Sequence, residues 1–168
     1  MIEGDTDKIL FDKVIKPLLK RKYHPVSIRK YSELGKEGTN SIIKTFIKNG
    51  DDYIFITDID KAKCISGKKQ EMMREFSNIH DGHKIIVVKK EIESWYIAGL
   101  ENNECKEFGF DPPSNTDKLG KGVFKEMRAK SGFKNDKAFM QEILRNFDIE
   151  TAKQGNTSFK YFVDKYCL

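Results

Sequence analysis

The stretch Tyr53-Ile54-Phe55-Ile56-Thr57-Asp58-Ile59-Asp60 decides the fold that we expect for this chain. Its first four residues favour β structure and polar residues bound the run, which is typical of a buried strand. Apolar side chains on both faces favour a central parallel strand covered by helices. Asp58 and Asp60 then leave the core at the carboxyl end of the strand, where open α/β sheets bind their ligands. Neighbouring carboxylates repel each other, so a metal cation is a natural ligand, although aspartate is also common in turns.

Periodic apolar residues around this stretch predict alternating helices and strands. Helical spacing extends over three segments, residues 6–23, 41–49 and 64–77. Pro17 is expected to kink the first helix, and Gly50 to end the second in the C′ role. Apolar runs predict strands over 26–31 and 84–89, with a short helix over 91–99. This alternation is typical of βαβ units, so we expect an α/β fold with a mostly parallel sheet flanked by helices.

The remainder of the chain is predicted to be helical with two loops. Residues 35–39 and 101–119 are rich in turn-forming residues and are expected to be loops. Beyond them, apolar side chains recur at helical spacing in three segments, around residues 123–127, 138–147 and 159–166. We therefore expect an α/β core over 1–100 and a C-terminal helical extension over 101–168, packed together as one domain.

Composition limits the classes of protein to consider. The chain has 168 residues, of which 38% are hydrophobic and 34% charged, as in a globular domain with a polar surface. It contains no apolar run of about 20 residues that would span a membrane, and its first residues lack the apolar segment of a signal peptide, so we expect a cytoplasmic protein. Three scattered cysteines without a CxxC pair indicate free thiols. A net charge of +5 permits a polyanionic partner without requiring one.

Acidic residues stand at three predicted strand-to-helix junctions. These are the pairs Glu3 and Asp7, Asp58 and Asp60, and Glu91 and Glu93. If the strands are parallel, all three pairs face one crevice. Carboxylates without histidine or cysteine favour a hard cation such as Mg²⁺ or Mn²⁺. Two such ions can clamp the attacking and leaving oxygens of phosphodiester hydrolysis. In the last pair we favour Glu93 as the ligand, because an acid such as Glu91 near a helix N-terminus is common without any function.

The order of these residues resembles the Toprim domain of topoisomerases, primases and small nucleases. Glu3-Gly4-Asp5-Thr6-Asp7 precedes a helix, and Asp58-Ile59-Asp60 follows a later strand, as in the nucleases of the OLD family. Trp95 and Ser158-Phe159 are similar to those of small stand-alone Toprim-like proteins, whose gene neighbourhoods indicate prokaryotic defence. The resemblance covers most of the chain. It departs from the domain at the start, where only Met1-Ile2 stand in place of a first strand.

The resemblance implies a Mg²⁺-dependent nuclease that binds nucleic acid. It assigns catalysis to Glu3, Asp58, Asp60 and Lys118, and metal binding to Glu3, Asp7, Asp58, Asp60, Glu91 and Glu93. Lys68, Lys69 and Lys121 are then expected to contact nucleic acid, although most lysines of such a chain are simply solvated. The alternative is a non-catalytic component that binds nucleic acid or an effector protein and keeps a Toprim-like fold.

Overall fold

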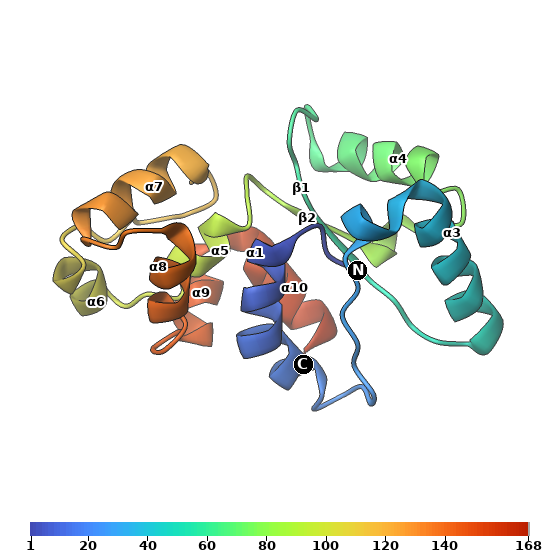
Figure 1. Ribbon diagram of the computed structural model, residues 1–168, viewed down its shortest axis with the longest axis horizontal. Coiled ribbons are helices and arrows are strands. Elements are labelled where there is room, and N and C mark those ends of the chain that lie inside the picture. Colours follow the sequence, from blue (N-terminus) through green and yellow to red (C-terminus); the bar gives the residue numbers. More distant parts are fainter. Residues whose placement is uncertain (168) are drawn as a thin grey trace.

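The computed structural model describes residues 1–167 as a set of helices around a small parallel sheet (Figure 1). Strands β1 (Phe55–Asp58) and β2 (Ile85–Val88) pair in parallel, with Phe55 opposite Ile85 and Asp58 opposite Val88. The two predicted buried strands are therefore confirmed. Within the described residues the regular sheet has only these two strands, so the fold is mixed α/β but mostly helical, and the expected larger sheet is wrong.

Two short segments extend the sheet by hydrogen bonds and a single bridge in place of a further strand. The Ile2 amide donates to the Arg29 carbonyl at 2.9 Å, and the Ile56 amide donates to the Met1 carbonyl at 2.9 Å. Residues 1–2 thus lie between β1 and residues 29–31. The predicted strand over 26–31 appears only as an isolated bridge between Ile2 and Lys30. The Met1 ammonium donates to the Ile54 carbonyl at 2.7 Å, and burial lowers its pKa to about 5.

Helices cover both faces of the sheet. Phe55, Ile85 and Val87 pack against side chains of α3 (Tyr31–Asn49) and α4 (Ile65–Glu75). The alternate residues Ile56, Ile86 and Val88 belong to a larger core that includes α1 and the helices of the C-terminal half. Figure 1 shows these two helical layers on opposite sides of β1 and β2. The alternation follows from the two-residue side-chain period of a strand, and it explains why both faces of the sequence are apolar.

The first predicted helix is confirmed, with an irregularity near its proline. It consists of α1 (Asp5–Leu10), a π-helical turn η1 (Phe11–Ile15) and α2 (Lys16–Leu19) in succession. Pro17 lies in the first turn of α2. Proline has no amide hydrogen to donate and its ring crowds the preceding turn, so the regular helical hydrogen-bond pattern is interrupted in this region.

Two predicted loops are partly helical. Gly35, with φ of 63° and ψ of 179°, interrupts α3 at a single residue, so the expected loop over 35–39 is wrong. Gly50 ends α3 with a φ of 72°, in the predicted C′ role. The expected loop over 101–119 contains helix α6 (Asn102–Glu107). The remaining helices are η2 (Gly82–Lys84), α5 (Glu93–Ala98), α7 (Lys121–Lys130), α8 (Asp136–Ile143), α9 (Ile149–Gly155) and α10 (Thr157–Tyr166).

Aromatic side chains join the two halves of the chain. Trp95 of α5 is fully buried and lies 5.6 Å from Phe162 and 5.2 Å from Phe159, measured between ring centroids, both on α10. Phe11 lies 6.1 Å from Phe162 by the same measure. One hydrophobic core therefore includes residues from before and after residue 100. No helix within residues 1–167 combines the length and the apolar character that crossing a membrane requires.

Candidate functional site

Three elements bring acidic side chains together at the carboxyl end of the sheet. Asp58 is the last residue of β1, and Glu93 is the first residue of α5, which follows β2. Asp7 comes from α1. The buried Tyr96 holds α1 and α5 in place, because its hydroxyl donates to the Thr6 carbonyl at 2.7 Å. The carboxylates of Asp7 and Glu93 are thus near enough to Asp58 to raise its pKa.

The acids lie in a poorly solvated and mostly negative environment. Burial raises the pKa of Asp58 to about 8, and repulsion from the carboxylates of Asp7 and Glu93 adds to this rise. Lys121 opposes the rise, and Glu3 adds to it. Burial also raises the pKa values of Asp7 and Glu93. The negative charge of these acids thus exceeds the positive charge that neighbouring residues provide.

Glu93 has an oxygen without a partner. Its side chain is 4% exposed, and its Oε2 atom accepts no hydrogen bond from any described residue. Asp7 is 8% exposed but accepts a hydrogen bond from the Gly4 amide at 2.6 Å. A buried acceptor without a donor is costly and uncommon in folded proteins. The Oε2 atom of Glu93 is therefore an acceptor that is available to a donor or a cation.

Lys121 is the cation of this cluster. Burial alone would lower its pKa, but the carboxylates of Glu93, Glu91, Asp58 and Glu3 together raise it. Glu91 accepts a hydrogen bond from the Lys121 amide, at the N-terminus of α7, and its other oxygen lies 3.7 Å from the Lys121 ammonium. Glu91 therefore fixes α7 beside the cluster, while Glu93 points an unpartnered oxygen into it.

Glu3 lies at the edge of the cluster. Its side chain is exposed, and Oε2 accepts a hydrogen bond from the Tyr31 hydroxyl at 3.3 Å. Its carbonyl accepts from the Ser32 hydroxyl, and the bridge between Ile2 and Lys30 precedes it directly. The two residues that stand in place of a first strand thus fix Glu3 in the structure.

Asp60, another predicted metal ligand, forms an ion pair with a lysine of α4. Its carboxylate is paired with the ammonium of Lys68, whose side chain is 11% exposed. Neither residue is among the main causes of the raised pKa of Asp58. Lys68 is therefore occupied and buried, Lys69 is half-buried, and Lys118 is exposed.

The donors suit a hard cation, but their arrangement is incomplete. All are carboxylate oxygens, the ligands that Mg²⁺ prefers. Within residues 1–167, however, no group of three or more Asp, Glu, His or Cys side chains converges closely enough to hold a metal ion. The structure thus has the chemistry of the predicted site without its closed geometry.

An open groove lies at the same edge of the sheet. It runs between the start of α4 and residues 115–118, and its polar lining includes Cys64, Ser66, Lys89, Asn115 and Lys118. Cys64 is exposed, and its hydrogen bonds with Ser66 and the Gly67 amide lower the pKa of its thiol. Cys105 and Cys167 are buried free thiols, so the prediction of unpaired cysteines is confirmed for all three.

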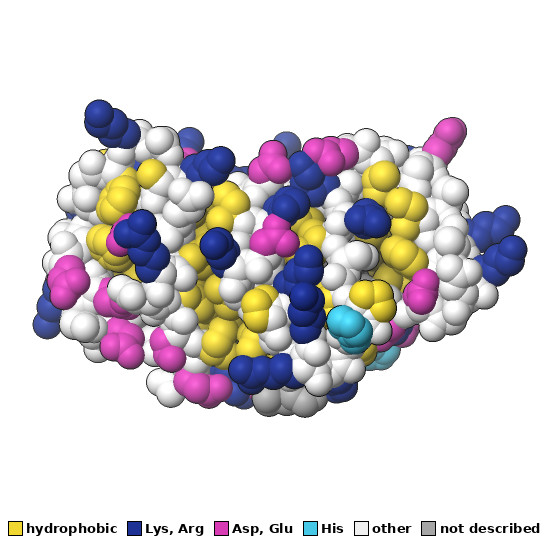
Figure 2. Space-filling model, turned by 60° about the horizontal axis from the view of Figure 1, so that its bottom comes forward, with side chains coloured by type: hydrophobic (Ala, Val, Ile, Leu, Met, Phe, Trp, Pro, Cys, Tyr) yellow, Lys and Arg dark blue, Asp and Glu magenta, His cyan; other side chains and the backbone are white. Residues whose placement is uncertain are grey.

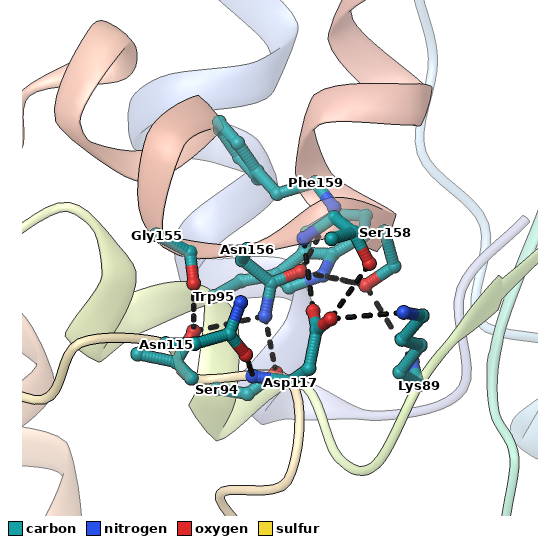
Figure 3. A network of polar contacts seen from close by, with 11 residues as sticks. Lys89, Ser94, Trp95, Asn115, Asp117, Gly155, Asn156, Ser158 and Phe159 are labelled. Carbon is teal, nitrogen blue, oxygen red and sulfur yellow. Dashed lines mark hydrogen bonds and ion pairs between the residues drawn. The ribbon is translucent and has the colours of Figure 1, made fainter.

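A buried polar network supports one wall of this groove (Figure 3). Asn156, at the start of α10, donates to the hydroxyls of Thr116 and Ser94 at 2.9 and 3.3 Å and accepts from that of Ser158 at 2.7 Å. Ser158 accepts in turn from the Trp95 indole at 2.9 Å. Asp117 accepts from the Lys89 ammonium at 2.9 Å and from both the amide and the hydroxyl of Thr157 at 2.8 Å. These bonds attach the segment that carries Lys118 to β2 and α10.

The opposite end of the sheet has a separate apolar cavity. Its volume is about 380 Å³, and its lining includes Met1, Tyr23, Pro25, Val26 and Ile54. Figure 2 shows hydrophobic side chains in hollows of the lower face of Figure 1, with lysines, arginines and acids scattered between them. The basic residues on this face form no continuous stripe, and the cavity lies at the amino end of the strands.

Sequence reasoning missed three parts of this arrangement. It assigned Lys121 to nucleic-acid binding and gave no sign that this residue also lies near the acids. It did not identify Tyr96 as the link between α1 and α5, or Asn156 as the centre of a network. The only signal for Asn156 was its position as an asparagine before a helix, which is typical of an N-cap.

The chain was compared with models of known protein families, with curated proteins and with solved structures, and none of them matches it.

Proposed function

We propose that this protein is a Mg²⁺- or Mn²⁺-dependent phosphodiesterase that cleaves nucleic acid. The observation that carries the proposal is the unpartnered Oε2 of Glu93, which lies buried beside Asp7 and Asp58 with Lys121 as the facing cation. The resemblance of Glu3, Asp7, Asp58 and Asp60 to the acids of the Toprim domain supports the same chemistry. A cytoplasmic role in prokaryotic defence remains part of this proposal.

The position of each residue determines the role that we assign to it. Glu93, Asp58 and Asp7 would hold the cation, and Glu3 would complete the set from the exposed edge. A hard cation in such a site stabilises negative charge on phosphate oxygens. Lys121 would offset charge on the reacting phosphate, and Lys118 would contact a neighbouring phosphate of the bound strand from the groove. The net charge of +5 permits a polyanionic substrate.

Exchanging Glu93 for glutamine tests this proposal directly. The substitution keeps the size of the side chain but removes its charge, so we expect Mg²⁺-dependent cleavage of an oligonucleotide to fall at least about tenfold, equivalent to about 1.4 kcal/mol. The matched control is Glu91→Gln, because a glutamine oxygen still accepts from the Lys121 amide. Cleavage by the control should stay within about threefold of the wild type, or about 0.6 kcal/mol. Equal cleavage by wild type and Glu93→Gln would rule out the assignment of Glu93.

A second function is favoured by the incomplete geometry of the acids. Because no three described donors converge on one point, a protein that binds nucleic acid or an effector without cleaving it is also consistent with the fold. It would bind a fluorescent oligonucleotide equally well in EDTA and in Mg²⁺, and Glu93→Gln would have no effect. A steep loss of affinity with salt would identify phosphate contacts, whereas salt-insensitive binding of a protein would identify an effector interface.

A further inference from the structure

Two stretches of backbone face each other across the apolar cavity at the amino end of the sheet. One is residues 26–29, which precede the bridge to Ile2, and the other is residues 50–54, which lead from α3 into β1. Figure 1 shows the two stretches separating from the point marked N, where Met1 and Ile2 lie between them. The cavity therefore continues the line of residues 1–2 along the sheet.

Backbone groups on both sides of the cavity have no partner. The Arg29 carbonyl and the Ile56 amide are both hydrogen-bonded to residues 1–2. Successive residues of an extended chain direct their backbone groups to opposite sides, so those of Ser27, Arg29 and Ile54 face this same line. Within the part of the chain that the structure describes, the amides of these three residues donate no hydrogen bond. An open edge of this kind is a template for pairing with another strand.

Side chains of residues 26–29 alternate between the core and the solvent. Val26 and Ile28 are half-buried and pack against the larger core, whereas Ser27 and Arg29 are exposed. A strand placed beside these residues would alternate in the same way, so every second side chain would enter the cavity. The apolar wall that it would meet includes the side chains of Phe11, Leu19, Val26, Ile28, Ile54 and Tyr166. The occupant must therefore carry an apolar side chain at every second position.

The rim of the cavity offers an uncompensated positive charge. The Arg29 guanidinium donates to the neighbouring Ile28 carbonyl at 3.3 Å and forms no ion pair with any acid that the structure describes. The acids of the lining, Asp51 and Asp52, lie on the stretch across the cavity, and Asp52 is already paired with the ammonium of Lys84. Charge complementarity therefore favours an acidic side chain in the occupant beside Arg29.

We propose that the apolar cavity binds an extended segment of a partner protein in which apolar and acidic residues alternate. The segment adds a strand in line with residues 1–2, and its backbone pairs with the free amides of Ser27, Arg29 and Ile54. Its apolar side chains enter the cavity, and an acidic side chain accepts hydrogen bonds from the Arg29 guanidinium. This binding site is separate from the acidic cluster and does not depend on the proposed function.

Fluorescence anisotropy with a labelled hexapeptide of alternating valine and aspartate tests the recognition. The 168-residue chain should bind this peptide saturably, and a peptide of alternating valine and lysine should bind at least about tenfold more weakly, because Arg29 repels it. Arg29→Glu should reverse this preference, and the fold is retained because the residue is exposed. Arg145→Glu is the matched control: Arg145 is exposed and does not line the cavity, so both affinities should be unchanged.

Two further measurements test the backbone pairing. Methylating alternate amide nitrogens of the valine–aspartate peptide removes donors without changing its side chains, so binding should weaken by at least about tenfold. In the free protein, the amides of Ser27, Arg29 and Ile54 should exchange readily with solvent when followed by NMR. Saturating peptide should slow their exchange by at least about tenfold, whereas the amide of the exposed Asp111 should keep its rate.

Several results would overturn the proposal. Equal binding of the two peptides, or no effect of amide methylation, would show that the cavity accepts apolar chains without recognising a strand. Binding that leaves the exchange of the three amides unchanged would place the peptide elsewhere on the protein. Absence of binding at about 1 mM peptide would also contradict the proposal. Protection of the three amides that increases with protein concentration alone would identify a second copy of the chain as the occupant, in place of a partner.

Discussion

Asp58→Asn is expected to stabilise the metal-free protein at pH 7 and to abolish its response to Mg²⁺. The pKa of Asp58 is raised to about 8 by burial and by the neighbouring carboxylates, so folding at neutral pH requires this group to take up a proton. The value pH 7 lies about three units above the ordinary pKa of an aspartate in the unfolded chain, so taking up the proton costs at most about 4 kcal/mol of the free energy of unfolding. Partial exposure of the side chain reduces this cost to about 2–3 kcal/mol. The melting temperature should rise by about 5–10 °C.

The gain from Asp58→Asn should depend on pH in a definite direction. A pKa that is higher in the folded state than in the unfolded state means that the contribution to stability is complete below about pH 4 and is lost as pH rises towards 8. Asparagine does not titrate, so the difference in free energy of unfolding between variant and wild type should be small at pH 4 and grow up to pH 8. Subtracting the wild type from the variant removes the pH dependence that other titrating groups contribute to the free energy of unfolding. One of these groups is the Met1 amine, whose lowered pKa makes stability rise with pH instead of falling.

Thermal denaturation with and without metal completes this test. In Mg²⁺ the wild type should melt at a higher temperature, because a ligand of the folded state stabilises it, whereas Asp58→Asn should be unaffected. Asp111→Asn is a suitable control, since Asp111 is exposed and should give no change in either condition. A loss of stability in metal-free Asp58→Asn would show that Asp58 is a satisfied structural group and not part of a strained acidic site.

Asn156→Ala is expected to lower the free energy of unfolding by about 3–4 kcal/mol. The side chain is fully buried, and its amide oxygen accepts both from the Ser158 hydroxyl and from the Phe159 amide, the latter at 3.0 Å. Its removal leaves these donors and the buried Thr116 hydroxyl with fewer partners, in addition to losing the N-cap of α10. Urea denaturation followed by circular dichroism should show the loss, and the melting temperature should fall by roughly 6–12 °C.

Asn135→Ala provides the matched control for this effect. Asn135 is also an asparagine N-cap, and it accepts from the Ala138 amide at 2.9 Å, but it is exposed and belongs to no buried network. Loss of an exposed N-cap costs about 1 kcal/mol. If both substitutions cost the same amount, the network around Asn156 contributes nothing beyond helix capping.

The sequence allowed most local elements to be predicted, because their signals are local. The apolar run before Asp58 and the run before Lys89 indicated β1 and β2, and Gly50 marked the end of α3. The extent of the sheet depends on contacts between distant segments, which local patterns do not specify. Residues 26–31 have strand-like composition, yet they find only Ile2 as a partner and form a single bridge. The break at Gly35 was read as a loop because a glycine-rich segment does not reveal how soon the helix resumes.

Only part of the candidate site could likewise be predicted from the sequence. The positions of Asp7, Asp58 and Glu93 after or beside strands indicated that they would meet, since parallel strands end at one edge of a sheet. The spacing of Asp58 and Asp60 indicated a shared face, but that holds only while the strand continues, and the chain turns at Asp60. Whether a lysine such as Lys68 or Lys121 faces acids or solvent depends on helix packing, which no spacing rule supplies.

The position of α10 in the core has a consequence for protein synthesis. Glu93 lies on α5, whose Trp95 packs against Phe159, and Asp7 lies on α1, which continues into η1, where Phe11 packs against Phe162. Both phenylalanines belong to α10, which is synthesised well after α1 and α5. While the chain is still being translated, α1 and α5 lack this support, so the acids have no fixed relation to one another. The acids of the N-terminal half can therefore take up their final relation to one another only after α10 has been synthesised and packed.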